Sequence, residues 1–300
     1  MTPLADPAVH VANVTEVASD VLVIPNDNGD LVPNIGIICG TDAVLVVDTG
    51  LGNANAVEVL DLAARVAGRR RIYLTTTHFH PEHAFGAQAF AGHATYLVNR
   101  AQAADLALKG SAYLTMFRGF GGAIAERLED VEVPVPDVVY DDLHELDLGN
   151  RVVRLRPTGQ GHTKGDQVIE VDGTLFTGDL AETDQFPIFP WFPPHDTDVS
   201  ATGWLAVLER VVATAPALVV PGHGGISTSQ LLVELADYLR DLLAQVDHRR
   251  ASLEEIIAEL RPLLIAQHPT WTGEEWIGPT IASMHSARAR GANGSEGVAG

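Results

Sequence analysis

The stretch Thr75-Thr76-Thr77-His78-Phe79-His80-Pro81-Glu82-His83 places three histidines and a carboxylate within six residues. It overlaps the end of an apolar run at 71–76 that has the composition of a β-strand. If extended backbone continues through the first two histidines, both point to one face and can share an ion. Pro81 suits the first turn of a helix, which would bring the last two residues of the stretch beside that pair. Neutral imidazoles and a carboxylate are ligands of zinc, iron and manganese, so the stretch predicts a metal site.

Composition narrows the classes of function. The chain has 300 residues, enough to bury a core without disulfide staples, and its lone Cys39 excludes an intrachain disulfide and a thiolate metal cage. A net charge of −20 opposes binding to nucleic acids and to anionic membrane surfaces. No run approaches the roughly 20 apolar residues that span a bilayer, and no export signal is recognisable. We therefore expect a cytoplasmic protein that acts on a small molecule, with a homodimer left open.

The hydrophobic pattern predicts an α/β protein. β-Branched runs between turn residues predict strands at 21–24, 35–39, 43–47, 71–76, 95–98, 152–155, 167–171, 175–177 and 218–220. Helical spacing of apolar residues predicts helices at 53–67, 102–108, 123–128, 200–213 and 230–246. Both halves give strands followed by a helix and a further strand. This order suggests two sheets packed face to face with helices outside, although periodicity leaves a single mixed sheet as an alternative.

The domain organisation follows from the same pattern. We expect one domain over residues 1–225, a helical extension over 226–286 and a disordered Gly, Ala and Ser-rich tail over 287–300. The glycine-rich residues 118–122 are either a mobile lid or a turn between helices. The aromatic and proline-rich residues 189–196 either line a pocket or pack under the extension.

Four further junctions between an apolar run and a loop carry a histidine or an aspartate next to glycine. Glycine permits the turn that aims such a side chain out of a sheet edge. The four are Val46-Val47-Asp48-Thr49-Gly50, Gly159-Gln160-Gly161-His162-Thr163-Lys164-Gly165-Asp166, Phe176-Thr177-Gly178-Asp179 and Val220-Pro221-Gly222-His223-Gly224.

With these motifs in this order, the segment from Val21 to Gly225 resembles the metallo-β-lactamase superfamily. The resemblance implies a four-layer αββα fold with a C-terminal helical appendage, a catalytic domain over 1–225 and two bound ions, zinc with iron or manganese as alternatives. It also implies a ligand set. The first ion would be held by His78, His80 and His162, the second by Glu82, His83 and His223, with Asp179 bridging both and Asp48 orienting a ligand.

One residue departs from the family pattern. The first motif of the family reads His-x-His-x-Asp-His, and here Glu82 stands in the place of the aspartate. Glutamate keeps the charge but adds a methylene, so its carboxylate reaches farther. Three outcomes fit: Glu82 ligates an ion, acts through water as a base, or leaves the second site weak.

The resemblance implies a metal-dependent hydrolase. A divalent ion lowers the pKa of its water towards about 7, and the resulting hydroxide would cleave a small ester, thioester, lactone or β-lactam, with Glu82 and Asp179 as catalytic carboxylates. The alternative of another class is a nonhaem di-iron oxidoreductase on the same fold. A nuclease is opposed by the charge, and a noncatalytic metal-binding module would need every ligand to serve structure alone.

Overall fold

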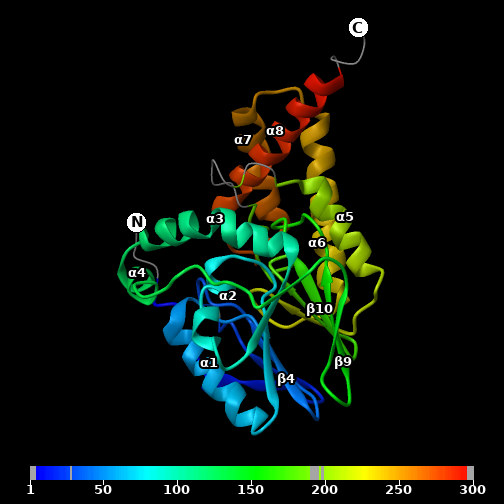
Figure 1. Ribbon diagram of the computed structural model, residues 1–300. Coiled ribbons are helices and arrows are strands. Elements are labelled where there is room, and N and C mark those ends of the chain that lie inside the picture. Colours follow the sequence, from blue (N-terminus) through cyan, green and yellow to red (C-terminus); the bar gives the residue numbers. More distant parts are fainter. Residues whose placement is uncertain (1–4, 28, 190–195, 197–198, 296–300) are drawn as a thin grey trace.

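Two β-sheets form the centre of the protein, which is described by a computed structural model over residues 5–27, 29–189, 196 and 199–295 (Figure 1). The first sheet has the order β1-β2-β3-β4-β5-β6-β7, antiparallel from β1 to β4 and parallel from β4 to β7. Its strands are β1 (Thr15–Ala18), β2 (Val21–Ile24), β3 (Ile35–Cys39), β4 (Ala43–Val47), β5 (Arg71–Thr75), β6 (Thr95–Asn99) and β7 (Val138–Tyr140). Every residue of β3 and β4 is buried, which explains their continuous apolar sequences.

The second sheet has the order β12-β11-β10-β9-β8, with only β11 and β12 parallel. Its strands are β8 (His144–Asp147), β9 (Val152–Pro157), β10 (Gln167–Val171), β11 (Thr174–Gly178) and β12 (Leu218–Pro221). Side chains of both sheets, among them Leu45, Val47, Leu155 and Phe176, form one buried cluster, so the sheets pack face to face.

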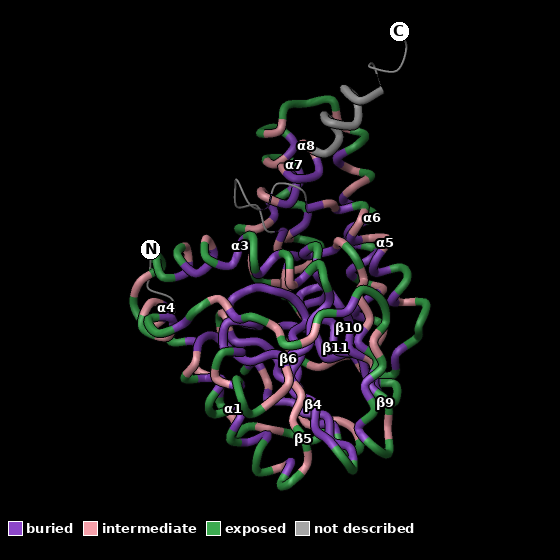
Figure 2. Tube along the Cα trace, viewed as in Figure 1, coloured by how far each residue is buried: buried purple, intermediate pink, exposed green. Residues whose placement is uncertain are grey.

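Helices cover the outer faces of the two sheets. The helices are α1 (Gly52–Ala67), α2 (Pro81–Ala84), α3 (Arg100–Arg118), α4 (Gly122–Arg127), α5 (Ala201–Val212), α6 (Ser229–His248), α7 (Leu253–Gln267) and α8 (Ile277–Ser295), with short 3₁₀ turns η1 (Val11–Asn13), η2 (Ala87–Phe90) and η3 (Glu274–Trp276). α1 packs on the first sheet, and α5 and α6 pack on the second. Figure 2 shows the buried sheets between helices whose outward faces are exposed. The four-layer architecture expected from the sequence is therefore confirmed.

All the predicted strands and helices are present, with small changes in their ends except for the helix predicted over 102–108, which α3 extends to Arg118. The strands that sequence reasoning missed are β1, β7 and β8, which lie at sheet edges. Edge strands are short and mix polar with apolar residues, so they lack the signal of a buried strand. The glycines of 118–122 form the turn between α3 and α4, with Gly121 and Gly122 at φ of 71° and 54°.

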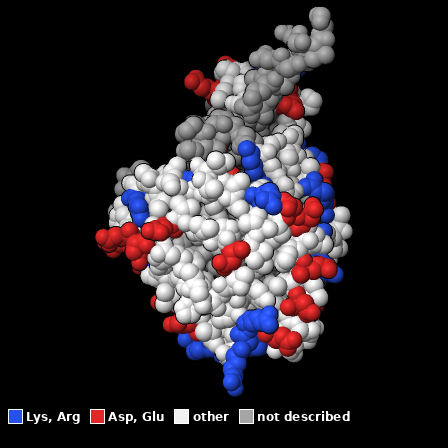
Figure 3. All heavy atoms as spheres, in the orientation of Figure 1, with Lys and Arg blue, Asp and Glu red and all other residues white. Residues whose placement is uncertain are grey.

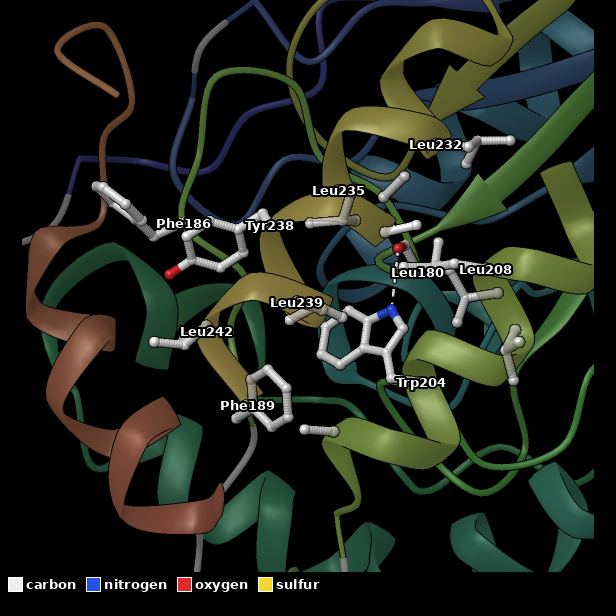
Figure 4. Close-up of a cluster of buried hydrophobic side chains, with 14 of the residues drawn as sticks. Leu180, Phe186, Phe189, Trp204, Leu208, Leu232, Leu235, Tyr238, Leu239 and Leu242 are labelled. Atoms are coloured by element: carbon white, nitrogen blue, oxygen red, sulfur yellow. Dashed lines mark hydrogen bonds between the residues drawn. The ribbon is translucent and has the colours of Figure 1, made fainter. Parts of the chain in front are cut away.

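The helical extension shares its core with the second sheet. Leu239 of α6, Leu260 of α7 and Ile281 of α8 belong to the same buried cluster as Trp204 of α5 and Val219 of β12. Figure 4 shows this cluster, in which the indole Nε1 of Trp204 donates to the carbonyl of Leu180 at 3.1 Å. The boundary at residue 225 thus crosses a continuous core.

The last helix, α8, continues to Ser295, so the described backbone reaches into the tail for which disorder was predicted. Residues 296–300 lie outside the described part. No helix of the described part is long and apolar enough to cross a membrane.

Replacing Leu239 with alanine tests the shared core. Leu239 is fully buried, so the substitution should lower the free energy of unfolding by about 2–5 kcal/mol. Because α6 shares a core with the sheet, denaturant unfolding should remain one cooperative transition with a lower midpoint. Leu108→Ala is the control: this side chain is 77% exposed, and its loss should cost less than about 0.5 kcal/mol. A separate early transition in Leu239→Ala would show that the extension unfolds independently.

Candidate metal centre

The loop after β5 turns the first motif into a cluster of donors. The strand ends at Thr75, so alternation along a strand is not what aligns the two histidines; a short irregular loop does this instead. His78 Nε2 lies 3.0 Å from His80 Nδ1. Pro81 occupies the first turn of α2, as expected, and this turn places Glu82 and His83 on the other side of the site.

The second half of the chain supplies the remaining donors from the edge of the other sheet. His162 follows β9, Asp179 follows β11 and His223 follows β12. His162 Nε2 lies 3.0 Å from His80 Nδ1, although 82 residues separate them in the chain. The structure thus brings together every residue that the resemblance implied as a ligand.

The donors form two groups that share Asp179. One consists of His78, His80, His162 and Asp179, the other of Glu82, His83, Asp179 and His223, and in each group the donor atoms lie within 4.8 Å of one another. In the first, Asp179 Oδ2 is 3.7 Å from His78 Nε2 and 3.6 Å from His162 Nε2. In the second, Asp179 Oδ1 is 3.2 Å from His83 Nε2 and 3.6 Å from His223 Nε2. Tetrahedral ligands at roughly 2.0–2.1 Å from zinc lie about 3.3 Å apart, close to these separations.

Several of these donors are buried without a partner. Within the described part, Glu82 Oε2, His83 Nε2 and Asp179 Oδ1 have no hydrogen-bond partner. A buried polar atom without a partner is costly unless something else binds it. The orphaned atoms and the donor types therefore fit divalent cations.

The protonation of His78 and His80 also fits metal binding. Burial lowers the pKa of His78 and of His80 well below the usual value, and neighbouring histidines lower it further. Both imidazoles are thus neutral at pH 7, which is the ligand form. Burial also opposes a charge on His83, but the carboxylates of Asp179 and Asp48 outweigh it and raise the pKa of His83 well above its usual value.

Asp48 orients one of the donors. Its Oδ2 lies 2.9 Å from His83 Nδ1, and its Oδ1 accepts the backbone N–H of Thr77 at 2.7 Å. In a neutral ring, a carboxylate at Nδ1 would hold the proton there and leave Nε2, beside the shared Asp179, available as a ligand. Asp48 has a φ of 67°, a left-handed conformation that aspartate tolerates better than most residues.

Two glycines explain the glycine-flanked motifs. A Cβ on Gly222 would lie 1.9 Å from Asp179 Oδ1, so only glycine lets β12 end this close to the shared carboxylate. Gly178 has a φ of 52°, and a Cβ there would lie 2.5 Å from Thr77 Oγ1. The loop of His162 is fastened differently: Asp166 accepts the backbone N–H of Thr163 at 2.9 Å, and His162 Nδ1 lies 3.0 Å from the carbonyl oxygen of Ile188.

Five of the donor residues line a cavity of about 760 Å³: His80, Glu82, His162, Asp179 and His223. Its other walls come from loops that follow the strands, from α3 and from the extension, which contributes Thr270, Thr272, Gly273, Glu275 and Trp276. The extension therefore helps to enclose the site. Residues 190–195, which sequence reasoning considered for the pocket, lie outside the described part.

Sequence reasoning missed two features of this cavity. Glu182 lines it and is buried, three residues beyond Asp179, yet it belongs to no recognisable motif. Tyr113 stacks on His80 with ring centroids 5.2 Å apart and donates its hydroxyl proton to Asp196. Lys109 Nζ completes that buried network, 2.7 Å from Asp196 and 3.0 Å from Asp105. Only the apolar spacing of α3 hinted that its inner face is buried.

Residues 28–223 match the family model described as the metallo-beta-lactamase superfamily, and the chain belongs to this superfamily. Among solved structures, a metallo-beta-lactamase family protein from Thermus thermophilus is similar over 92% of this chain and 96% of its own, with 18% identity and a TM-score of 0.66. A metallo-beta-lactamase from Pontibacter korlensis matches over 76% and 98%, with 20% identity and a TM-score of 0.61. The TM-scores and the shares of the chains covered show a common fold. No curated protein sequence matches the chain.

Replacing Asp48 with asparagine should weaken the second group of donors. The amide would donate to His83 Nδ1 and force the ring proton onto Nε2, the atom that faces Asp179. We expect about 10–100-fold weaker binding of one of two ions, measured by metal titration with elemental analysis. The control is Asp61→Asn, an exposed aspartate of α1. Two ions bound with unchanged affinity would contradict the orienting role of Asp48.

Proposed function

We propose that the protein is a divalent-metal-dependent hydrolase of a small ester, thioester, lactone or β-lactam, with zinc as its ion and the cytoplasm as its location. The observation that carries this proposal is that two donor groups share Asp179 and that residues of both groups line one cavity. Ions held by these residues would activate water and polarise the carbonyl that it attacks.

The residues of the chain have distinct roles in this proposal. His78, His80 and His162 hold one ion, and Glu82, His83 and His223 hold the other. Asp179, with one oxygen towards each group, fixes their separation. Glu82 and Asp179 are also the carboxylates that can take up a proton from water and return it to a leaving group.

Features outside the donor groups support hydrolysis of a small molecule. The cavity is large enough for a drug-sized ligand, and its volume falls in the range of small-molecule sites. On the face seen in Figure 3, acidic and basic side chains are interspersed and form no continuous basic patch of the kind that binds nucleic acids.

Replacing His162 with alanine tests the assignment of the first group. Metal-loaded wild type should hydrolyse at least one member of a panel of esters, thioesters, lactones and β-lactams. The variant should lose one ion and about a thousandfold or more in kcat, since metal activation contributes several kcal/mol. His93→Ala, which removes an exposed histidine, is the control. Unchanged turnover in a variant with verified metal content would overturn the assignment.

The same panel separates the hydrolase from the di-iron alternative. Apoprotein is reloaded separately with zinc, manganese or iron. A hydrolase should be active with zinc, which has no redox chemistry. A coloured, iron-loaded protein that consumes oxygen and hydrolyses nothing would favour the oxidoreductase.

Replacing Glu82 with aspartate tests why the longer side chain is present. Its Oε2 is buried and without a described partner, and aspartate would withdraw the carboxylate by one methylene. We expect about 10–100-fold weaker binding of the second ion, measured by metal titration, with Glu58→Asp on the exposed face of α1 as the control. Unchanged affinity for both ions would show that the reach of glutamate is not needed.

A further inference from the structure

The described cavity wall contains several carboxylates and no lysine or arginine. Among the described lining residues there is no lysine or arginine, and the sequence of 190–198 contains neither. The lining carboxylates are Asp30, Glu82, Asp179, Glu182, Asp184 and Glu275. Asp30, Glu182, Asp184 and Glu275 belong to neither donor group, so their carboxylates are available to a ligand beyond the ions.

Glu182 is the carboxylate of this set whose surroundings best fit a bound ligand. It is 7% exposed, its Oε2 accepts the amide of Gln185, and its Oε1 has no hydrogen-bond partner in the described part. Burial and the nearby Asp179 raise the pKa of this carboxyl well above its usual value, although His83 lowers it. A cation placed beside it would stabilise the ionised form, and burial keeps that attraction from being screened by water.

Aromatic rings line the same cavity. Tyr113 and Phe117 come from α3, Phe120 from the turn after it and Trp276 from η3. Phe120 is 50% exposed, although it is a large apolar side chain. Aromatic faces attract ammonium groups, and carboxylates beside such faces add Coulomb attraction. The carboxylates and the aromatic rings thus line one cavity.

The extension fixes part of this wall. The backbone of Thr272 donates to the carbonyl of Asp184 at 2.8 Å and accepts from the N–H of Phe186 at 3.0 Å. These bonds tie the segment before η3 to the segment that carries Glu182. The backbone that precedes Glu275 and Trp276 at the cavity is therefore held in place by hydrogen bonds.

We propose that this cavity recognises substrates bearing an ammonium group, with Glu182 as the principal charge-recognising residue and the aromatic rings as the surface on which the cation rests. Glu275 and Asp184, which are exposed, add a weaker and screened attraction. The proposal rests on the proposed hydrolase for its chemistry, but charge recognition is a separate property that binding alone can test.

The catalytic test compares thioesters of one shape and different charge. Acetylthiocholine, its uncharged carbon isostere and an analogue with a sulfonate in place of the ammonium are offered to the metal-loaded protein. We expect kcat/KM to favour the cation over the isostere at least about tenfold, with the anion poorest. Glu182→Gln should reduce the cation-to-isostere ratio severalfold while keeping the metal content. Glu58→Gln is the matched control and should leave the ratio unchanged.

The binding test does not depend on hydrolysis. Choline and its uncharged carbon isostere are titrated into the metal-loaded protein and followed by ligand-observed NMR. Choline should bind at least about tenfold more tightly, and Glu182→Gln should remove most of that difference. Equal binding of the two probes would overturn the proposal.

The two tests together distinguish the proposals from each other. Selective binding of choline without turnover of any ester would refute the hydrolase and leave charge recognition standing. Turnover of an ester without preference for the cation would support the hydrolase and overturn charge recognition. Loss of an ion in Glu182→Gln, or an equal loss of kcat/KM for cation and isostere, would assign Glu182 to the metal site and overturn its role here.

Discussion

The carboxylate of Asp179 is the constraint on which the arrangement depends. It is buried among four histidines from both halves of the chain, with one oxygen towards each donor group. A buried carboxylate is costly unless opposite charges or strong donors surround it. Burial raises its pKa, but the neighbouring histidines, His83 above all, outweigh burial and lower the pKa well below its usual value. The negative charge is thus retained where both groups of donors need it.

The two sheets explain how such a costly cluster is tolerated. Their facing sides form a continuous apolar core, so the polar donors are confined to the loops and to α2 at one edge of the sandwich. Close approach there requires residues without side chains, and Gly178 and Gly222 meet that need. The apolar core stabilises the fold, and the residues at the edge position the donors.

The helical extension connects stability with specificity. α6, α7 and α8 complete the core outside the second sheet, and the segment between α7 and α8 contributes Glu275 and Trp276 to the cavity. The charge and aromatic character of the wall therefore come partly from a region beyond the residues that match the family model. Proteins that share the fold and the donors can differ in what they bind, because part of this wall lies outside the residues that match the family model.

The sequence by itself determined the local features of this protein. Buried strands such as β3 and β4 are continuous apolar runs, Pro81 starts a helix, and the histidine-rich stretch with glycine-flanked motifs indicated the family and its donors. Edge strands escaped prediction because their residues are only partly buried. Tertiary structure alone decided that His162 lies 3.0 Å from His80, that Asp48 meets His83, and that Glu182 and Tyr113 face the cavity. The physical reason is that such contacts depend on the packing of two sheets and an extension, whereas periodicity and motif spacing report only on neighbours along the chain.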